Sequence, residues 1–160
     1  MVEAYFADLL MKLTIVNQTS EKLNTKRLNK TLALVVGALQ KKRLRLKNKL
    51  VSKEEIVFVF LTPLKMQKIN SQFRGKNKPT DVLSFASEDP SAMGELLFCN
   101  AVLKKQAKVQ KHSADFELAY MMIHGILHLL GYDHEISTKE EKVMLKIQDD
   151  CFAQVRHLLS

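Results

Sequence analysis

The sequence is poor in cysteine and lacks long apolar runs. Two cysteines occur among 160 residues, Cys99 and Cys151, and each stands in an apolar stretch. A disulfide framework is therefore not indicated, and we expect a reducing compartment, the cytoplasm, with both thiols acting as small buried groups. No segment approaches the roughly eighteen uninterrupted apolar residues of a membrane-spanning helix, so we expect no membrane partner.

The first ten residues, MVEAYFADLL, lack the basic segment that opens a secretory signal. A clearer strand pattern begins at Met11, hence we expect residues 1–10 to be a loosely held extension of one domain that spans residues 1–160. Internal repeats, low-complexity tracts and linkers are also absent. Hydrophobic residues make up 46% and charged residues 26% of the chain, proportions that exclude disordered and fibrous proteins.

Positive charge is in excess. Lysine and arginine number 25 against 17 acidic residues, which gives a formal net charge of +8 and an isoelectric point near 9.5. Such a balance favours a polyanionic partner. Two stretches are especially basic, residues 41–53 and 104–111. Runs of this kind are usually solvated helix faces, but both would also serve to track phosphates.

Hydrophobic periodicity predicts four strands and five helices in the order βαβαββααα, with the last two strands antiparallel. The strands are expected at residues 12–17, 55–61, 81–86 and 94–99. The helices are expected at residues 24–46, 63–74, 100–111, 116–130 and 138–158. The expected N-caps are Thr62, Asn100, Asp115 and Ser137. The apolar face of the last helix is predicted to consist of Val143, Ile147, Cys151, Val155 and Leu158.

Three of the five histidines lie within the run MIHGILHLLGYDH. His124 and His128 are one helical turn apart and therefore share a face. Gly131 predicts the end of the helix, after which His134 can approach the pair from a loop. A single histidine is usually an ordinary core or surface residue, but three at this spacing indicate a metal site. Three imidazoles leave one tetrahedral position of a zinc ion open, as catalytic zinc sites do.

Position 125 is Gly, where a peptide-cleaving zincin carries the Glu that takes a proton from the metal-bound water. A peptidase would therefore lack its general base. Gly125 costs about 1 kcal/mol in a helix interior, so we expect the close approach of another backbone or of substrate there. His112 and His157 show no ligand spacing, and we expect ordinary surface or helix-end residues.

A second chemical feature is the connection FRGKNKPTD, which carries Arg74, Lys76 and Lys78 between a helix and a strand. A guanidinium suits a pair of phosphate oxygens, although a solvated basic turn is an equally good interpretation of the charges alone. Thr80 and Asp81 begin the next strand. They are either part of a site or turn residues that bond their own backbone.

Taken together, FRGKNKPTDVLSF, GELLF and HGILHLLGYDH resemble the YbeY family of bacterial metal-dependent endoribonucleases, which act in ribosomal RNA maturation. The resemblance runs from about Leu13 to Leu158, and the histidine motif matches the family's at every fixed position. One departure is Glu95 in GELLF, where Asp is the usual family residue. A carboxylate is kept, so the departure touches only a detail.

The resemblance implies a small zincin-like α+β fold, with a mixed four-stranded sheet and the metal-site helix near the C-terminus. It implies that His124, His128 and His134 bind one zinc ion per chain and that Arg74 is catalytic. The implied partners are single-stranded RNA, ribosomal RNA and the small ribosomal subunit, with no DNA target. A competing hypothesis is a ribosome-assembly factor whose metal is mainly structural. Asp133 either orients a ligand imidazole or stabilises the turn.

Overall fold

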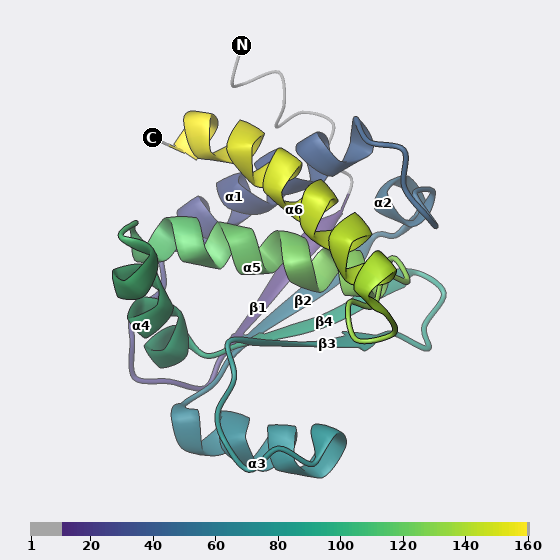
Figure 1. Ribbon diagram of the computed structural model, residues 1–160. Coiled ribbons are helices and arrows are strands. Elements are labelled where there is room, and N and C mark those ends of the chain that lie inside the picture. Colours follow the sequence, from purple (N-terminus) through teal and green to yellow (C-terminus); the bar gives the residue numbers. More distant parts are fainter. Residues whose placement is uncertain (1–10, 160) are drawn as a thin grey trace.

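The computed structural model describes residues 11–159, drawn in colour in Figure 1. Our expectations for residues 1–10 lie outside the described residues. The elements are β1 (Lys12–Asn17), α1 (Thr25–Gln40), α2 (Lys49–Ser52), β2 (Glu55–Phe60), α3 (Pro63–Arg74), β3 (Val82–Ala86), β4 (Ala92–Phe98), α4 (Asn100–Gln110), α5 (Ala114–Leu129) and α6 (Thr138–Leu159). No helix within this part of the chain is long and apolar enough to span a membrane.

The four strands form one mixed sheet in the order β1-β2-β4-β3. Strands β1, β2 and β4 run parallel, whereas β3 pairs antiparallel with β4, with Leu83 opposite Leu97 and Ala86 opposite Gly94. The α+β class, the mixed sheet and the antiparallel pair were all predicted and are confirmed. Because β4 lies between β2 and β3, strand β3 forms an edge of the sheet, and within residues 11–159 it pairs with no strand other than β4.

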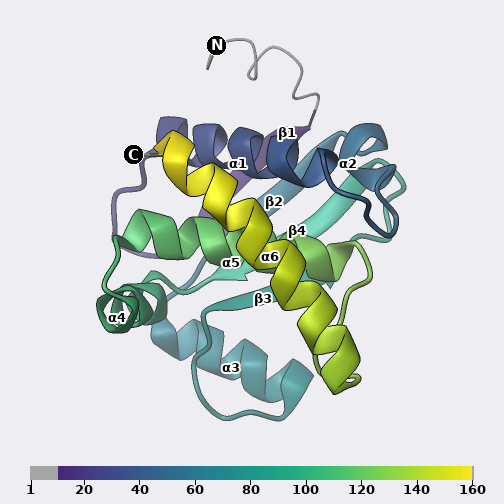
Figure 2. The same ribbon diagram turned by 45° about the horizontal axis from the view of Figure 1, so that its top comes forward.

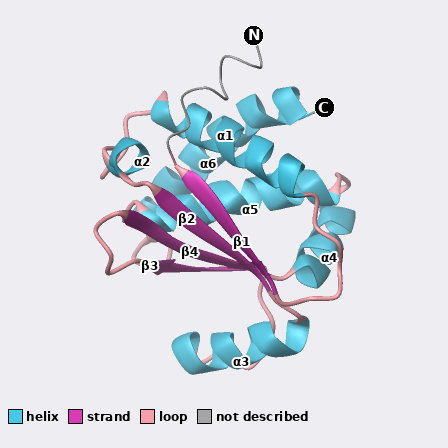
Figure 3. Cartoon of the chain, turned by 180° about the vertical axis from the view of Figure 1, so that it is seen from behind, coloured by secondary structure: helices cyan, strands magenta, loops and turns pink. Residues whose placement is uncertain are grey.

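Helices cover the two faces of the sheet unequally. Helices α1, α5 and α6 lie on one face with α4 beside them, and α3 alone lies on the other (Figures 1 and 3). Helix α6 crosses α5 on the side away from the sheet (Figure 2). The main core lies under α1 and α5 and includes Phe58, Phe98 and Ile123. A smaller core under α3 contains Leu61, Met66, Leu83, Leu97 and Cys99.

The first helix is shorter than predicted. A continuous helix was expected over residues 24–46, but α1 ends at Gln40 and a loop leads to the short α2. The buried apolar spacing of α1 ends at Leu39, and Leu46 has a φ of +48°, which lies outside the helical region. The described residues therefore form six helices, where about five were expected.

Two of the four predicted N-caps are wrong. Helix α5 is capped by Ser113, not Asp115, because the Ser113 hydroxyl accepts a hydrogen bond from the backbone N–H of Phe116 at 3.1 Å. Helix α4 begins at Asn100, so Cys99 occupies its N-cap position. The cap residue must precede the first helical residue, and in both cases the predicted residue lies inside the helix.

The last helix begins as predicted, but its buried face is rotated. The Ser137 hydroxyl accepts from the backbone N–H of Glu140 at 3.2 Å, as a cap does. Val143 and Leu158, predicted to be buried, are exposed. The buried residues of α6 are Met144, Gln148, Cys151, Val155 and Leu159. Because one residue of this buried stripe, Gln148, is polar, the pattern of apolar residues alone did not identify the buried face.

Both cysteines are free and buried, as predicted. Burial raises the pKa of the Cys151 thiol to about 11. A thiol that stays protonated at neutral pH is a poor nucleophile and a poor metal ligand. Cys151 is therefore a packing residue.

Candidate metal centre

Helix α5 carries His124 and His128, and their rings face each other. The ring centroids are 4.7 Å apart, and the two Nε2 atoms are 3.1 Å apart. The i, i+4 spacing on one helix brings them together without help from the rest of the fold. Both side chains point into a pocket between α5 and the edge strand β3.

The turn after α5 brings in the third histidine. Gly131 has a φ of +89°, a left-handed conformation that glycine adopts without steric cost. Its N–H donates to the carbonyl of His128 at 3.0 Å, and the N–H of Tyr132 donates to the carbonyl of Leu127 at 3.1 Å. This paired arrangement is a Schellman motif, which ends the helix and reverses the chain. The predicted role of Gly131 is confirmed.

His134 follows this turn and completes the cluster. Its ring centroid lies 5.1 Å from that of His124 and 5.2 Å from that of His128. One nitrogen from each of the three rings lies within 4.8 Å of the other two. The structure thus brings together the three histidines that the spacing singled out. Their function as metal ligands remains a prediction.

Two observations indicate that these residues fit a metal ion. The Nδ1 atom of His134 is buried and has no hydrogen-bond partner among residues 11–159, an arrangement that is costly unless another group binds there. The donor set is also suitable, since three imidazoles are typical ligands of zinc and of other divalent transition metals.

Gln148 of α6 holds His124 in a defined orientation. Its Oε1 lies 3.0 Å from Nδ1 of His124, and its Nε2 donates to the carbonyl of Tyr120 at 3.3 Å. Because an amide oxygen only accepts, Nδ1 of His124 carries the hydrogen and Nε2 presents its lone pair to the cluster. Only 1% of Gln148 is exposed. Gln148 was not among the predicted site residues, although a polar residue between Met144 and Cys151 at buried helical spacing was a usable signal.

Burial keeps the imidazoles of His124 and His128 neutral. Burial first, and then the neighbouring imidazoles of His124 and His134, lower the pKa of His128 to about 4. Burial also lowers the pKa of His124. Neutral imidazole is the form that binds metals, so these two side chains need not release a proton at neutral pH.

Arg74 reaches the same pocket from the opposite face of the sheet. Helix α3 follows the predicted N-cap Thr62, and its C-cap is Gly75, whose φ is +66°. Arg74 forms an ion pair with Glu135, the residue after His134, and Lys76 lies 3.7 Å from the same carboxylate. The ion pair crosses the edge of the sheet beside β3. The pocket, of about 350 Å³, is lined by Arg74, His124, His128, Val82, Ser84 and Ala86 among others.

The loop that carries His134 is supported by Arg45. The guanidinium binds both carboxylate oxygens of Glu140, at 2.7 and 2.9 Å, and lies 4.8 Å from the centre of the Tyr132 ring. The backbone N–H of Arg45 donates to the Tyr132 hydroxyl at 3.1 Å. Lys42 from the same basic stretch pairs with Asp150. Parts of the stretch 41–53 therefore bind the protein's own carboxylates rather than standing free for phosphates.

Two roles were considered above for each of Thr80, Asp81 and Asp133, a role in the site or a role in stabilising a turn. Asp133 accepts a hydrogen bond from the backbone N–H of Glu135 at 2.9 Å. Asp81 accepts one from the next backbone N–H at 2.7 Å and one from the Thr80 hydroxyl at 3.1 Å. It also accepts from Gln106 of α4 at 3.1 Å. The contacts of Thr80 and Asp133 favour the local, turn-stabilising interpretation, whereas Asp81 also anchors α4 through Gln106.

Gly125 is explained by the sheet and not by a substrate. A Cβ atom at this position would lie 2.8 Å from Cδ2 of Leu96 and 3.3 Å from Oγ of Ser84. The Ser84 hydroxyl donates to the carbonyl of Gly125 at 3.2 Å. The expected neighbour, another backbone or the substrate, was wrong. The close neighbours are side chains of β4 and β3. Because glycine has no Cβ atom, α5 can pack tightly against them.

His112 is not a surface residue. Only 11% of its side chain is exposed, and its Nε2 lies 2.5 Å from the buried carboxylate of Glu117. Its ring meets those of Phe116 and Phe152 edge-on. The surface alternative fails because α4, α5 and α6 meet at this point, which local spacing does not reveal. The helix-end alternative is confirmed, since the His112 N–H donates to the carbonyl of Ala107 just after the end of α4. His157 is exposed near the end of α6, as expected.

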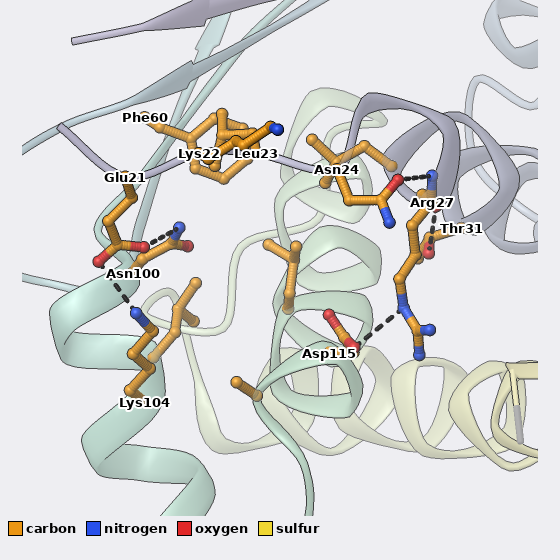
Figure 4. A pocket seen from close by; sticks show the side chains of 14 residues that line it. Glu21, Lys22, Leu23, Asn24, Arg27, Thr31, Phe60, Asn100, Lys104 and Asp115 are labelled. Carbon is orange, nitrogen blue, oxygen red and sulfur yellow. Dashed lines mark hydrogen bonds and ion pairs between the residues drawn. The ribbon is translucent and has the colours of Figure 1, made fainter. Parts of the chain in front are cut away.

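A second pocket, of about 290 Å³, lies at the other end of α5 and is shown in Figure 4. Four of its charged groups pair with each other: Arg27 with Asp115 at 2.9 Å and Lys104 with Glu21 at 2.9 Å. Asn100 also donates to Glu21, at 3.4 Å. Most of the charge in this pocket is therefore neutralised internally, and the remaining charged residue of its lining is Lys22.

Fold and site define a small α+β protein that gathers three histidines beside the edge of a mixed sheet. The family model described as "Endoribonuclease YbeY" matches residues 14–156. The chain therefore belongs to the YbeY family. It is 44% identical to the Endoribonuclease YbeY of Bdellovibrio bacteriovorus, an alignment covering 89% of this chain and 93% of that one. It is 39% identical to that of Lysinibacillus sphaericus, over 60% and 69%. The solution structure of TM1509 from Thermotoga maritima superposes with a TM-score of 0.60 at 27% identity, covering 90% and 89%.

Proposed function

We propose that this protein is a metal-dependent endoribonuclease that cleaves single-stranded RNA in the cytoplasm during ribosomal RNA processing. Membership of the YbeY family supports endoribonuclease activity. The observation that carries the rest is a cluster of three imidazoles, two of which, those of His124 and His128, line one pocket together with Arg74. We further propose that residues 1–160 form one domain and that its partners include ribosomal RNA and the small ribosomal subunit.

His124, His128 and His134 would hold one zinc ion per chain. When bound, zinc supplies a Lewis acid that polarises a phosphoryl oxygen and lowers the pKa of coordinated water. Gln148 holds the His124 ring so that Nε2, and not Nδ1, faces the site. Three protein ligands leave an open position, which favours catalysis over a purely structural metal.

Arg74 would bind the phosphate at which cleavage occurs. Its guanidinium lines the pocket with His124 and His128 and is paired with the carboxylate of Glu135. A phosphate is also a two-oxygen anion and can replace this carboxylate on the guanidinium. As negative charge develops on the phosphoryl oxygens, two N–H donors from one planar group stabilise it.

The shape of the pocket supports a single-stranded substrate. It is bounded by β3 on one side and by the loop that carries His134 on the other, and its volume is about 350 Å³. A nucleotide from an unpaired strand can be turned into such a space, whereas a stiff duplex keeps its bases stacked and its backbone outside. The net charge of +8 provides the general attraction for RNA.

The test is cleavage of a labelled single-stranded RNA by the purified protein, with and without a chelator. We expect cleavage that stops with the chelator and returns when zinc is added, and little cleavage of the same strand in a duplex. A ribosome-assembly factor with a structural metal would bind RNA without cutting it. Unchanged cleavage in the chelator, in a preparation shown to be free of metal, would contradict the metal mechanism.

A further inference from the structure

Phe73 is an aromatic residue exposed to solvent beside the candidate site. It lies in the last turn of α3, next to Arg74, and 60% of it is exposed. Among the exposed large apolar residues of the described chain, it is the only aromatic one. Single exposed apolar residues are common on protein surfaces, so its location has to decide whether it has a function.

The Phe73 ring is held in place beneath the edge of the sheet. It meets the ring of Phe85 edge-on, with centroids 5.1 Å apart and an angle of 71° between the planes. Phe85 lies in β3 between Ser84 and Ala86, both of which line the metal pocket. Because side chains alternate between the two faces of a strand, Phe85 and Phe73 lie on the opposite face of this edge strand from the histidines.

Arg74 connects the two faces. Its guanidinium reaches past the edge strand to the pocket and to Glu135, while the ring of the preceding residue stays below. The connection after α3 is also fixed. Asn70 donates to the carbonyl of Lys78 at 2.8 Å, and Gln67 donates to the Asn77 side chain at 3.0 Å. The ring and the guanidinium are therefore presented together on a well-anchored segment.

We propose that Phe73 is a stacking platform for one nucleobase of the RNA, next to the phosphate that Arg74 binds. This inference rests on the proposed function and adds a base-binding subsite to it. Stacking on an aromatic ring accepts any base, because every base has a π-face. The strand would cross the free edge of β3, with a phosphate in the pocket on one side and a base on Phe73 on the other.

This arrangement would select for single strands. A base can lie on Phe73 only if it has left its own stack and pair, which a duplex resists. The basic residues Lys76 and Lys78 follow directly in the chain and are exposed, so the flanking phosphates meet positive charge. A protein ligand for Phe73 fits less well, because the surroundings of the ring are cationic.

The first test uses tryptophan fluorescence. The chain has no tryptophan, so Phe73→Trp would introduce a single reporter. Titration with a short single-stranded RNA in the presence of a chelator, which prevents cleavage, should quench this fluorescence as a base stacks on the ring. The control is Leu64→Trp at the start of the same helix, where Leu64 is 63% exposed, and it should not respond. An oligonucleotide with abasic sites should bind through its phosphates without quenching.

The second test measures affinity. Phe73→Ala should raise the Kd for the same RNA about tenfold, whereas Phe73→Tyr and Leu64→Ala should bind like the wild type. Metal content and melting temperature should not change, and KM for cleavage should rise more than kcat falls. Equal Kd values for Phe73→Ala and wild type, or bound RNA without quenching of Phe73→Trp, would overturn the platform alone. A wild type that neither binds nor cleaves RNA would overturn the proposed function and the platform together.

Discussion

The two ends of α5 carry pockets of similar size that differ in how their polar groups are paired. At the N-terminal end, Arg27 pairs with Asp115, and Lys104 pairs with Glu21 (Figure 4). At the C-terminal end, three imidazoles converge, and the buried Nδ1 of His134 has no hydrogen-bond partner in the described part of the chain. Polar groups that already satisfy one another support the fold, whereas convergent groups with unused lone pairs are available for chemistry.

The strongest test of this contrast is removal of one ligand. His128→Ala should abolish zinc binding and reduce RNA cleavage to background, because two imidazoles do not hold the ion at neutral pH. Arg27→Ala, which breaks an exposed ion pair at the other end, should keep metal content and activity, since such pairs contribute little. Elemental analysis and a cleavage assay measure both variants. A His128→Ala protein that retained its zinc would show that the cluster is not the metal site.

A smaller loss is expected when the metal stays but the guanidinium is removed. Arg74→Ala should slow single-turnover cleavage roughly a hundredfold, about 3 kcal/mol of barrier, because charge on the phosphoryl oxygens is left unbalanced. Arg74→Lys should restore part of the rate, since an ammonium lacks the planar two-pronged geometry. Metal content and melting temperature should stay those of the wild type. Near wild-type turnover would make Arg74 a solvated turn residue, and unfolding would make it structural.

Replacing Arg45 tests whether zinc binding in the C-terminal pocket depends on the contacts that Arg45 makes to the loop that carries His134. Arg45→Ala removes the contacts to Glu140 and the Tyr132 ring, so the loop that carries His134 should become less ordered. Residues that orient metal ligands typically contribute ten- to a hundredfold in affinity, and we expect about tenfold weaker zinc binding in competition with a chromophoric chelator. Arg43→Ala removes the same charge from the same loop and should bind zinc like the wild type. Equal zinc affinities for the two variants would mean that the loop that carries His134 keeps its conformation without Arg45.

The smallest expected effect is a pH dependence confined to the C-terminal end. Below about pH 6.5 the unfolded chain protonates His128, whereas the folded, metal-free protein does so only near pH 4, where burial holds its pKa. The unfolded state then binds more protons, so the free energy of unfolding falls as the pH drops through this range, by about 1 kcal/mol after allowance for partial exposure. Urea unfolding of the metal-free protein at pH 7.5 and 5 measures it. The dependence should be smaller in His128→Ala, and an equal slope in both proteins would assign it to other groups.

Sequence by itself determined the local parts of this protein. The approach of His124 to His128 follows from 3.6 residues per turn, and the turn that delivers His134 follows from a glycine that can take a left-handed conformation. The antiparallel pair β3–β4 likewise joins neighbouring segments. Each of these features depends on residues near one another in the sequence, at most 16 positions apart for Val82 and Phe98, so periodicity and turn chemistry are enough to predict them.

Only the tertiary structure decided which distant residues complete the site. Arg74 and Glu135 are 61 positions apart and meet because β3 is an edge strand that an arginine can reach around. Arg45 and Glu140 are 95 positions apart. Because Arg45 is paired with Glu140, it is not free to bind phosphates, as the basic stretch 41–53 was predicted to do. Gln148 faces His124 because α6 packs across α5. Such contacts are set by how helices and strands pack against one another, and no local pattern in the chain encodes that packing.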